Sequence, residues 1–392
     1  MDQSTYLSAA SCLQGDAVRL RRLLHQYPEA SKGEVNTNRL IRAELDSAGI
    51  AYLAPEDNIT IALLPGARPG KTAAIRSDTD AIEVVEMNDT AYRSRHDGLM
   101  HACGHDAHMA MGLVAARLLH QRREARSGLV KVIFQPAEEG AGGALRVMDT
   151  GLVDDVEAFY ALHVWPLLAT GMIRLSPGPV CAGTDLLRID VQGAGGHGAY
   201  PELCRDAVAA SAAIITALQH VVSREVPALE PAVLTIGSIR AGTRWNVIAG
   251  SASMEGTIRT FSAAVRDAMT EKVKLYTKNI AAAHGCTADV EVTPVCRSNI
   301  NDGSITALAV RSAEKVFGAK RCLPQEKSMI GDDFSEYSAI APGCYAFLGI
   351  DDGRGAGCLP LHHNRFSLDE NALQYGAAWL AEAADRFAAG GD

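Results

Sequence analysis

The chain has 392 residues, more than twice a typical domain of about 150, so we expect two domains. Hydrophobic residues make up 47% and charged residues 21%, which is ordinary for a globular protein and excludes a disordered or low-complexity chain. The 37 basic and 46 acidic residues give a net charge of −9, which argues against nucleic acid or an anionic membrane as the main partner.

From Asp16 to about Val180, segments with helical apolar spacing alternate with short apolar strands. Such alternation predicts an α/β domain with a mainly parallel sheet flanked by helices. The predicted helices are Ala17–His25, Thr37–Ala48, Ala107–His120 and Gly142–Thr150, and the predicted strands are Thr72–Arg76, Leu129–Phe134 and Ala158–Leu162.

The pattern changes from about Ala182 to Cys296, where the order is strand, helix, strand, strand, helix, strand. This order is typical of a split βαβ sandwich with its helices on one face. Its elements are Leu186–Gln192, Asp206–Val222, Ala232–Ile239, Ser251–Thr260, Ala263–His284 and Ala288–Pro294. After Asn299 we expect a helix at Ile305–Phe317, a strand at Gly343–Gly349 and a helix at Glu370–Arg386. The prediction is therefore a catalytic domain of residues 1–181 and 297–392, interrupted by a smaller α+β domain of residues 182–296.

Several features favour the cytoplasm as the location. No apolar run reaches the roughly 18 residues of a membrane span, and Ala207–Val222 is interrupted by polar residues. The first residues lack the basic segment and apolar core of a secretory signal. Nine cysteines, an odd number without the spacing of a disulfide scaffold, suggest a reducing compartment.

The densest group of potential metal ligands is the segment HACGHDAH at 101–108, which opens a predicted helix. Thiolate and imidazole are favoured ligands of zinc and its neighbours, and Gly104 allows the tight turn that would bring Cys103 and His105 inward. A polar turn with a buried cysteine is the alternative interpretation of so short a motif.

An acidic pair, Glu138 and Glu139, directly follows the predicted strand Leu129–Phe134. Open α/β sheets place their sites at the carboxyl ends of strands, so one acid is expected to bind a metal ion while the other acts as a base. A solvated acidic loop is the alternative. Asp80 follows another strand, where it would either orient a ligand histidine or cap the next segment.

Two further histidines, His163 after a strand and His362 before the last helix, extend the candidate set. Either one alone is more often structural than a ligand. Together with Cys103, His105 and Glu139 they make five donors, one more than a tetrahedral ion uses. A site for two divalent ions with one bridging ligand is therefore predicted, with Glu138 as general base.

The inserted domain contributes a glycine-rich turn, GAGGHGAYP at 193–201, around His197. Its spacing does not fit a dinucleotide-binding loop, so we reject a nucleotide site. His197 would reach a reacting carbonyl oxygen, or it is simply a turn histidine. Asn246 and Arg259 are candidates for binding a substrate carboxylate, because arginine matches carboxylates in geometry, or they are a surface residue and a strand residue in a salt bridge.

Taken in order, these motifs resemble the aminoacylase/carboxypeptidase-like metallo-amidohydrolases, in the branch with hippurate hydrolase, N-acyl-amino-acid amidohydrolases and auxin-conjugate hydrolases. The resemblance extends from LRRLLHQYPEAS near the start to the last helix. The motifs that carry it are HACGHDAHMA, QPAEEGAGGA, ALHVWP, GGHGAYP, NVIAG, GTIRT, GDDFSEY, PGCYAFLG and LHHNRFSLDE.

The resemblance implies a catalytic α/β domain with an inserted ferredoxin-like satellite domain that often dimerises. It implies metal ligation by Cys103, His105, Glu139, His163 and His362, and Glu138 as the general base. It also implies contact with the substrate or its oxyanion for His197, Asn246 and Arg259, across a dimer in some members.

Three departures from the branch's usual motifs bear on specificity. Glu83 stands where the first acidic strand usually continues to proline, Glu202 replaces a histidine in the satellite turn, and Asp332 replaces the acid of an E-D-F motif. None removes a ligand or the base. The two glutamates would favour a cationic substrate or repel a carboxylate.

We therefore expect metal-dependent hydrolysis of the amide bond of an N-acyl amino acid or a related small amide. The alternatives are a dipeptidase or carboxypeptidase on the same scaffold, a binding protein without turnover, an amide synthase, a structural zinc protein, or a thiol hydrolase using Cys103. The thiolate favours zinc, whereas imidazole and carboxylate also accept manganese, cobalt or nickel. The expected partners are a small amide substrate and a second copy of the chain through the satellite domain, with no nucleic acid and no membrane.

Overall fold

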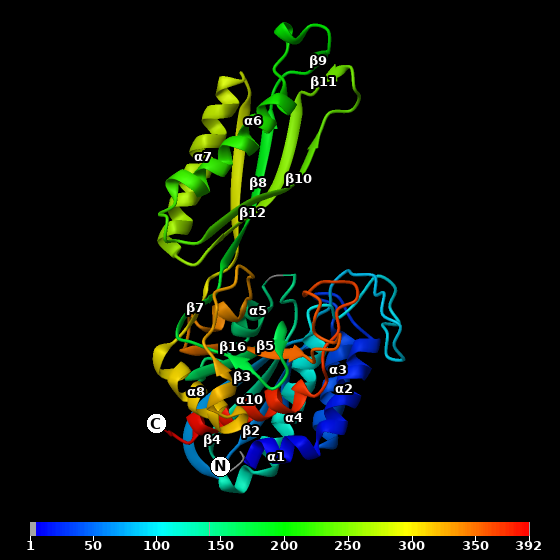
Figure 1. Ribbon diagram of the computed structural model, residues 1–392, viewed down its shortest axis with the longest axis vertical. Helices are drawn as coiled ribbons and strands as arrows, with labels where there is room; N and C mark the ends of the chain where they lie inside the picture. Colours follow the sequence, from blue (N-terminus) through cyan, green and yellow to red (C-terminus); the bar gives the residue numbers. More distant parts are fainter. Residues whose placement is uncertain (1–4, 141, 392) are drawn as a thin grey trace. The chain divides into compact units, whose positions relative to one another are not determined.

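The computed structural model describes residues 5–140 and 142–391, which separate into two compact units (Figure 1). The first unit extends to Val180 and resumes at Ile300–Glu326 and from Asp333 onward. The second comprises Cys181–Asn299 and Lys327–Asp332. Residues 327–332 belong to the second unit because they are hydrogen-bonded to it. The Ala182 amide, for example, donates to the Ser328 carbonyl oxygen at 3.0 Å.

The first unit is built on an eight-stranded sheet. Its order is β1 (Tyr52–Glu56), β2 (Ile59–Pro65), β4 (Ser127–Gln135), β3 (Arg68–Asp78), β5 (Ala158–Ala169), β16 (Gly343–Asp351), β6 (Ile173–Arg174) and β15 (Cys322–Leu323). The central strands β4, β3, β5 and β16 are parallel, and antiparallel pairs occur towards both edges. The predicted mainly parallel sheet is thus confirmed.

Helices cover both faces of this sheet. On one face α4 and α10 pack against side chains such as Tyr160, and on the other the neighbouring Phe159 stacks on Tyr337 of α9 with ring centroids 5.0 Å apart. The α-helices are α1 (Thr5–Cys12), α2 (Gln14–Gln26), α3 (Val35–Ser47), α4 (His105–Gln121), α5 (Gly143–Asp149), α8 (Gly303–Phe317), α9 (Phe334–Tyr337) and α10 (Ala372–Ala388), and short 3₁₀ turns lie at Arg123–Ala125 and Ala319–Arg321.

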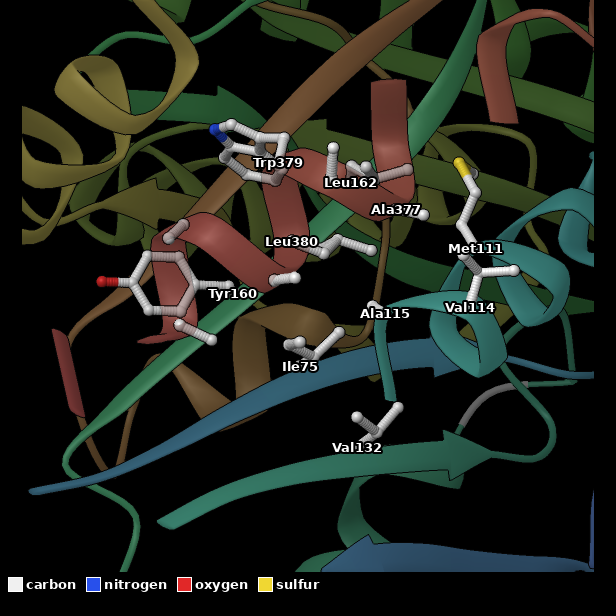
Figure 2. Close-up of a cluster of buried hydrophobic side chains, with 14 of the residues drawn as sticks. Ile75, Met111, Val114, Ala115, Val132, Tyr160, Leu162, Ala377, Trp379 and Leu380 are labelled. Carbon is white, nitrogen blue, oxygen red and sulfur yellow. The ribbon is translucent and has the colours of Figure 1, made fainter. Parts of the chain in front are cut away.

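The core of the first unit lies between α4, α10 and the central strands (Figure 2). Trp379 and Leu380 of α10 and Met111 of α4 are fully or almost fully buried there. The indole Nε1 of Trp379 donates to the Ala309 carbonyl oxygen at 3.2 Å, so the ring buries its apolar surface without leaving its donor unpaired. Packing against α10 and the sheet therefore fixes the position of α4, whose first residue is His105.

The second unit has a four-stranded antiparallel sheet in the order β10 (Ala232–Ala241), β12 (Ser251–Thr260), β8 (Gly183–Gln192) and β13 (Thr287–Cys296). Burial alternates along β8, and its inward side chains share one apolar cluster with both α6 (Ala207–His220) and α7 (Ala263–Ala283). Both helices therefore cover the same face of the sheet, which is the predicted split βαβ arrangement.

Smaller elements complete the chain. A two-stranded sheet pairs β9 (Gly196–His197) with β11 (Val247–Ile248), and another pairs β7 (Gly178–Cys181) with β14 (Asn299–Asn301). A 3₁₀ turn lies at Pro201–Leu203 and a π turn at Val221–Glu225. By length and composition alone, one helical stretch of the described chain, Ala207–Glu225, is apolar enough to cross a membrane, but its buried side chains pack on the sheet of the second unit.

The buried indole gives a test of the core. Replacing Trp379 with alanine should lower the free energy of unfolding of the first unit by about 3–5 kcal/mol, because a large cavity opens between α10 and the sheet. Chemical denaturation would measure this change. Trp245→Ala is the control, because this side chain is 91% exposed, and its effect should stay below about 0.5 kcal/mol. Equal stability of the two variants would contradict the packing described for α10.

Candidate metal centre

The loop before α4 turns sharply at Gly104, which has a φ of 87°. A Cβ atom at this position would lie 2.4 Å from Cγ2 of Val164, so both the backbone conformation and the space require glycine. The turn places Cys103 and His105 on either side of the glycine, and both side chains are buried. The predicted role of Gly104 in this motif has a clear structural basis.

The donors predicted from the sequence converge in overlapping groups, in each of which the ligand atoms lie within 4.8 Å of one another. Cys103, His105 and His163 form one such group, and the Cys103 Sγ and His163 Nε2 atoms are 3.4 Å apart. His163 lies inside β5 and not at its end, because β5 continues to Ala169 in register with β16. All three side chains of this group are buried.

The second group contains Cys103, Glu139 and His362. His362 Nε2 lies 3.1 Å from Glu139 Oε1, and half of the histidine side chain is exposed. His362 has a left-handed backbone, with a φ of 65°, and its amide donates to the Ala102 carbonyl oxygen at 2.9 Å. Glu138 joins Glu139 and His105 in a third group. All five predicted ligands and the predicted base thus lie around one shared region.

Hydrogen bonds set which nitrogen each buried histidine presents to this region. His105 Nδ1 lies 2.9 Å from the Asp80 carbonyl oxygen, and His163 Nδ1 lies 2.7 Å from the Val164 carbonyl oxygen. Because a carbonyl oxygen only accepts, both Nδ1 atoms carry a proton, which leaves the Nε2 atoms as the ones available to a metal ion. His105 Nε2 is buried and has no hydrogen-bond partner among the described residues. Together, these donors and this orphaned nitrogen fit a divalent ion.

The electrostatic surroundings are strongly negative. Burial alone would lower the pKa of His105, but the carboxylates of Asp78 and Asp80 outweigh it and raise that pKa to about 10. Burial raises the pKa of the Cys103 thiol well above its usual value, and Glu139 and Glu138 raise it further. Such an environment attracts cations and disfavours an isolated thiolate, which argues against Cys103 as a nucleophile.

Asp80 links three parts of the centre. Its Oδ2 atom accepts hydrogen bonds from the Ser31 hydroxyl at 2.6 Å and from the Glu139 amide at 2.9 Å. Its Oδ1 atom is 3.3 Å from His105 Nδ1. Asp80 thus contacts both His105 and Glu139, and its role in orienting a ligand histidine stays a prediction.

Sequence reasoning missed a second layer of buried residues. His108 Nδ1 lies 2.6 Å from Asp78 Oδ1, and its Nε2 atom accepts from the Val164 amide at 3.0 Å. Arg76 bridges Asp78 Oδ2 at 2.5 Å and Asp333 Oδ1 at 2.8 Å. The spacing of His108 three residues after His105, on one face of a helix, was the available signal.

A further buried group supports the start of α4. Asp106 Oδ2 lies 2.7 Å from both Arg21 Nε and His25 Nδ1, and all three side chains are at most 1% exposed. Burial lowers the pKa of nearby His101 to about 4, so this histidine is neutral. Neither ring nitrogen of His101 has a hydrogen-bond partner in the described part of the chain, and the residue belongs to none of the donor groups.

The candidate substrate contacts of the second unit fall into two places. His197 and Val247 pair between β9 and β11, and the Gly198 amide donates to the Asn246 carbonyl oxygen at 2.9 Å, so His197 and Asn246 are close together. Arg259 lies near the far end of β12, where its Nη1 donates to the Met329 carbonyl oxygen at 2.8 Å. The structure does not bring Arg259 together with the other two.

The structure also shows where the acidic residues that differ from the branch's usual motifs lie. Glu83 and Glu202 are exposed, whereas Asp332 and Asp333 are buried. Asp333 Oδ2 accepts from the Ala144 amide at 2.9 Å and thereby holds the start of α5. The effect of the two exposed glutamates on specificity stays a prediction.

Asp80 provides a test of the centre. Asp80→Asn places an amide group where the Ser31 hydroxyl and the Glu139 amide now donate, and it removes the charge beside His105 Nδ1. Glu139 should therefore lose its orientation, and His105 should lose its charged neighbour. Metal affinity, measured by competition with a chromophoric chelator, should fall roughly 10- to 100-fold. Asp46→Asn, at an exposed position of α3, should change it less than twofold. Unaltered affinity in Asp80→Asn would refute this orienting role.

Comparison with known proteins agrees with this geometry. The chain is 38% identical to the N-acetylcysteine deacetylase of Bacillus subtilis over 369 residues, which cover 94% of this chain and 95% of that protein. It is 33% identical to IAA-amino acid hydrolase ILR1-like 4 of Arabidopsis thaliana, over 94% of this chain and 85% of that protein.

Among solved structures, a dinuclear metal binding peptidase from family M20 of Bacillus subtilis superposes with a TM-score of 0.84. That structure is 35% identical in sequence, and the match covers 96% of this chain and 99% of that chain. Residues 74–386 match the model of Peptidase family M20/M25/M40. The resemblance predicted from the sequence is therefore confirmed, and the chain belongs to Peptidase family M20/M25/M40.

Proposed function

We propose that this protein is a metal-dependent amidohydrolase that cleaves N-acyl amino acids into a carboxylic acid and an amino acid. The observation that carries the proposal is the convergence of five ligand side chains with Glu138 beside them. A relative named as a deacetylase of N-acetylcysteine and another named as a hydrolase of IAA-amino acids support amide substrates of this class.

The proposed ligands are Cys103, His105, Glu139, His163 and His362. They occur in overlapping groups that share Cys103, His105 and Glu139, which suits two ions with a bridging ligand. Zinc fits the thiolate best, and manganese, cobalt or nickel fit the imidazole and carboxylate donors. When bound, such ions polarise the amide carbonyl and lower the pKa of water.

In this proposal Glu138 moves the protons. It accepts a proton from the attacking water and delivers it to the leaving nitrogen, as general acid–base catalysis requires. The Ala137–Glu138–Glu139 turn follows β4, so the base and a ligand stand side by side at the carboxyl end of a central parallel strand. Asp80 maintains the orientation of His105 and Glu139 during this transfer.

The proposed substrate contacts come from the second unit, which acts as the satellite domain. His197 Nδ1 accepts from the Ala199 amide at 3.1 Å, which leaves Nε2–H as a donor for the carbonyl oxygen as negative charge develops. The side-chain amide of Asn246 has two N–H donors, and Arg259 uses Nη1 on the backbone. The remaining donors of Asn246 and Arg259 suit a substrate carboxylate.

The positions of these residues support a homodimer. Arg259 lies eight positions after Ser251, where β12 begins near β11, and eight steps of extended strand span about 26 Å. A small substrate does not span this distance, so His197 and Arg259 of one copy would serve different active sites. A second copy that supplies His197 and Asn246 resolves the separation.

An apolar groove between α6 and α7 offers a surface for this second copy. It is lined by Ala212, Ala213, Thr216, Ala217, His220, Leu275, Tyr276, Asn279 and Ile280. Leu275 is 52% exposed, and most of the surface that lines the groove is apolar. Contiguous apolar surface of this kind is typical of protein interfaces.

We also propose that the protein is cytoplasmic. All nine cysteines are free thiols, and five of them besides Cys103 are buried. Unpaired cysteines spread through a chain of this size suit a reducing compartment.

Glu138→Gln tests the proposed base. The substitution keeps the size of the side chain but removes its ability to take up a proton, so kcat on N-acetyl amino acids should fall at least about 100-fold. Metal content, measured by elemental analysis, should equal that of the wild type. Full turnover in the variant would show that another group is the base.

Leu275→Glu tests the proposed dimer surface. A charge in the groove between α6 and α7 should shift the chain from dimer to monomer in light scattering coupled to size-exclusion chromatography. Activity should fall with it, because each site would lose the partner's histidine and asparagine. Leu229→Glu, at a 96% exposed residue outside the groove, should leave the dimer intact. A monomeric wild type, or a dimeric Leu275→Glu, would contradict the proposal.

A further inference from the structure

Glu34 is a completely buried carboxylate that precedes α3. Its Oε1 atom accepts from the Ala137 amide at 2.7 Å and from the Lys32 amide at 3.0 Å. Its Oε2 atom accepts from Asn58 Nδ2 at 2.9 Å. Three donors from three segments thus compensate a charge that would otherwise be costly to bury.

Both backbone amides that meet Oε1 belong to residues with left-handed backbones. The φ angle is 53° at Ala137 and 74° at Lys32, a region that non-glycine residues rarely adopt. Ala137 directly precedes Glu138. Without the bond to Glu34, the alanine would favour a right-handed or extended backbone, and the side chain that follows it would point elsewhere.

Neighbouring contacts connect the segment around Glu34 to the acidic turn at Gly140 and to the residues that follow β3. The Ser31 hydroxyl donates to Asp80, and the Ala81 amide donates to the Glu29 carbonyl oxygen at 2.8 Å. A Cβ atom on Gly140 would lie 2.6 Å from Ser31 Cβ, so the two backbones are in close contact at the end of the turn. The turn is therefore held at Ala137, at Glu139 and at Gly140.

We infer that Glu34 is a positioning residue for catalysis, whose buried carboxylate holds Ala137 in its left-handed conformation and thereby aims Glu138 at the reacting amide. The inference rests on the proposed role of Glu138 as general base. Glu34 touches neither the predicted ligands nor the substrate in this role. Glu34 raises the fraction of molecules in which the Ala137–Glu139 turn points Glu138 at the reacting amide, and this fraction sets kcat.

Glu34→Ala is the first test. Removal of the acceptor lets Ala137 leave the left-handed region, so kcat on an N-acetyl amino acid should fall about 5- to 30-fold, the population change that matches the usual cost of a left-handed alanine. KM and metal content should stay within twofold of the wild type. Glu34→Gln keeps one acceptor oxygen and the size of the side chain, so its loss should be smaller, and it serves if Glu34→Ala does not fold.

Ala137→Gly supplies the decisive second variant. Glycine adopts the left-handed region without strain, so Ala137→Gly combined with Glu34→Ala, or with Glu34→Gln, should recover most of the lost kcat. A role of Glu34 in overall stability alone would not be relieved by this change. A loss of kcat that glycine does not relieve would therefore overturn the inference, as would a kcat within twofold of the wild type in folded, metal-loaded Glu34→Ala.

Glu29→Ala is the matched control. Glu29 belongs to the same segment, but its carboxylate accepts from the amides of Asn36 and Thr37 at the start of α3 and not from the acidic turn. This variant should lower thermal stability and keep kcat. Glu138→Gln, assayed in parallel, separates the two proposals: if it retains turnover, the proposed base is wrong, and if it is inactive while Glu34→Ala is fully active, only the role of Glu34 is wrong.

Discussion

The centre depends on one carboxylate more than on any other group, that of Asp80. Its two oxygens meet the imidazole of His105, the amide of Glu139 and the hydroxyl of Ser31. These contacts hold together three segments that are separate in the sequence: the end of a strand, the start of a helix and the acidic turn. Asparagine at this position would keep only one acceptor oxygen and would lose the negative charge that lies beside the His105 imidazole.

Around this point, the structure buries several charges together. Asp78, Asp80 and Asp106 are all at most 1% exposed, and arginines or histidines compensate each of them. Such burial is expensive unless every member is paired, which explains why Arg76 and Arg21 are themselves almost inaccessible to solvent. The donors that face the shared region still carry excess negative charge. A pair of divalent cations, as proposed, would balance this charge and would couple metal binding to local stability.

Much of this was predictable from local patterns. The sequence alone predicted the segment around Cys103 and His105, the acidic pair after β4 and the alternation of helices and strands, because each of these depends on residues that are neighbours in the chain. The antiparallel pair β1 and β2 was missed, since β1 is a short exposed edge strand that contains Pro55. The continuation of β5 past His163 was also missed, because it depends on pairing with β16, which lies far along the chain.

Other features required contacts between distant segments. Nothing in the sequence near Glu34 indicates that its carboxylate meets Ala137, which is about a hundred residues away. Likewise, the sequence marks His108 as one of several histidines near the start of α4, but its bond to Asp78 appears only in the structure. The candidate ligands and their order can be recognised from short sequence motifs. The residues that contact and orient them come from distant segments, and a single sequence contains no direct signal for contacts of this kind.

The inserted unit adds a constraint of a different kind. An extended strand of ten residues has a fixed length, so β12 keeps Arg259 well separated from the turn that carries His197 and Asn246. From Ser251 to Arg259 the strand spans about 26 Å, which is longer than the reach of a side chain. If all three residues serve the same reaction, as we propose, then a complete substrate site requires two chains. Dimerisation would then be part of the catalytic design, and the apolar groove between α6 and α7 would be as necessary to turnover as the ligands themselves.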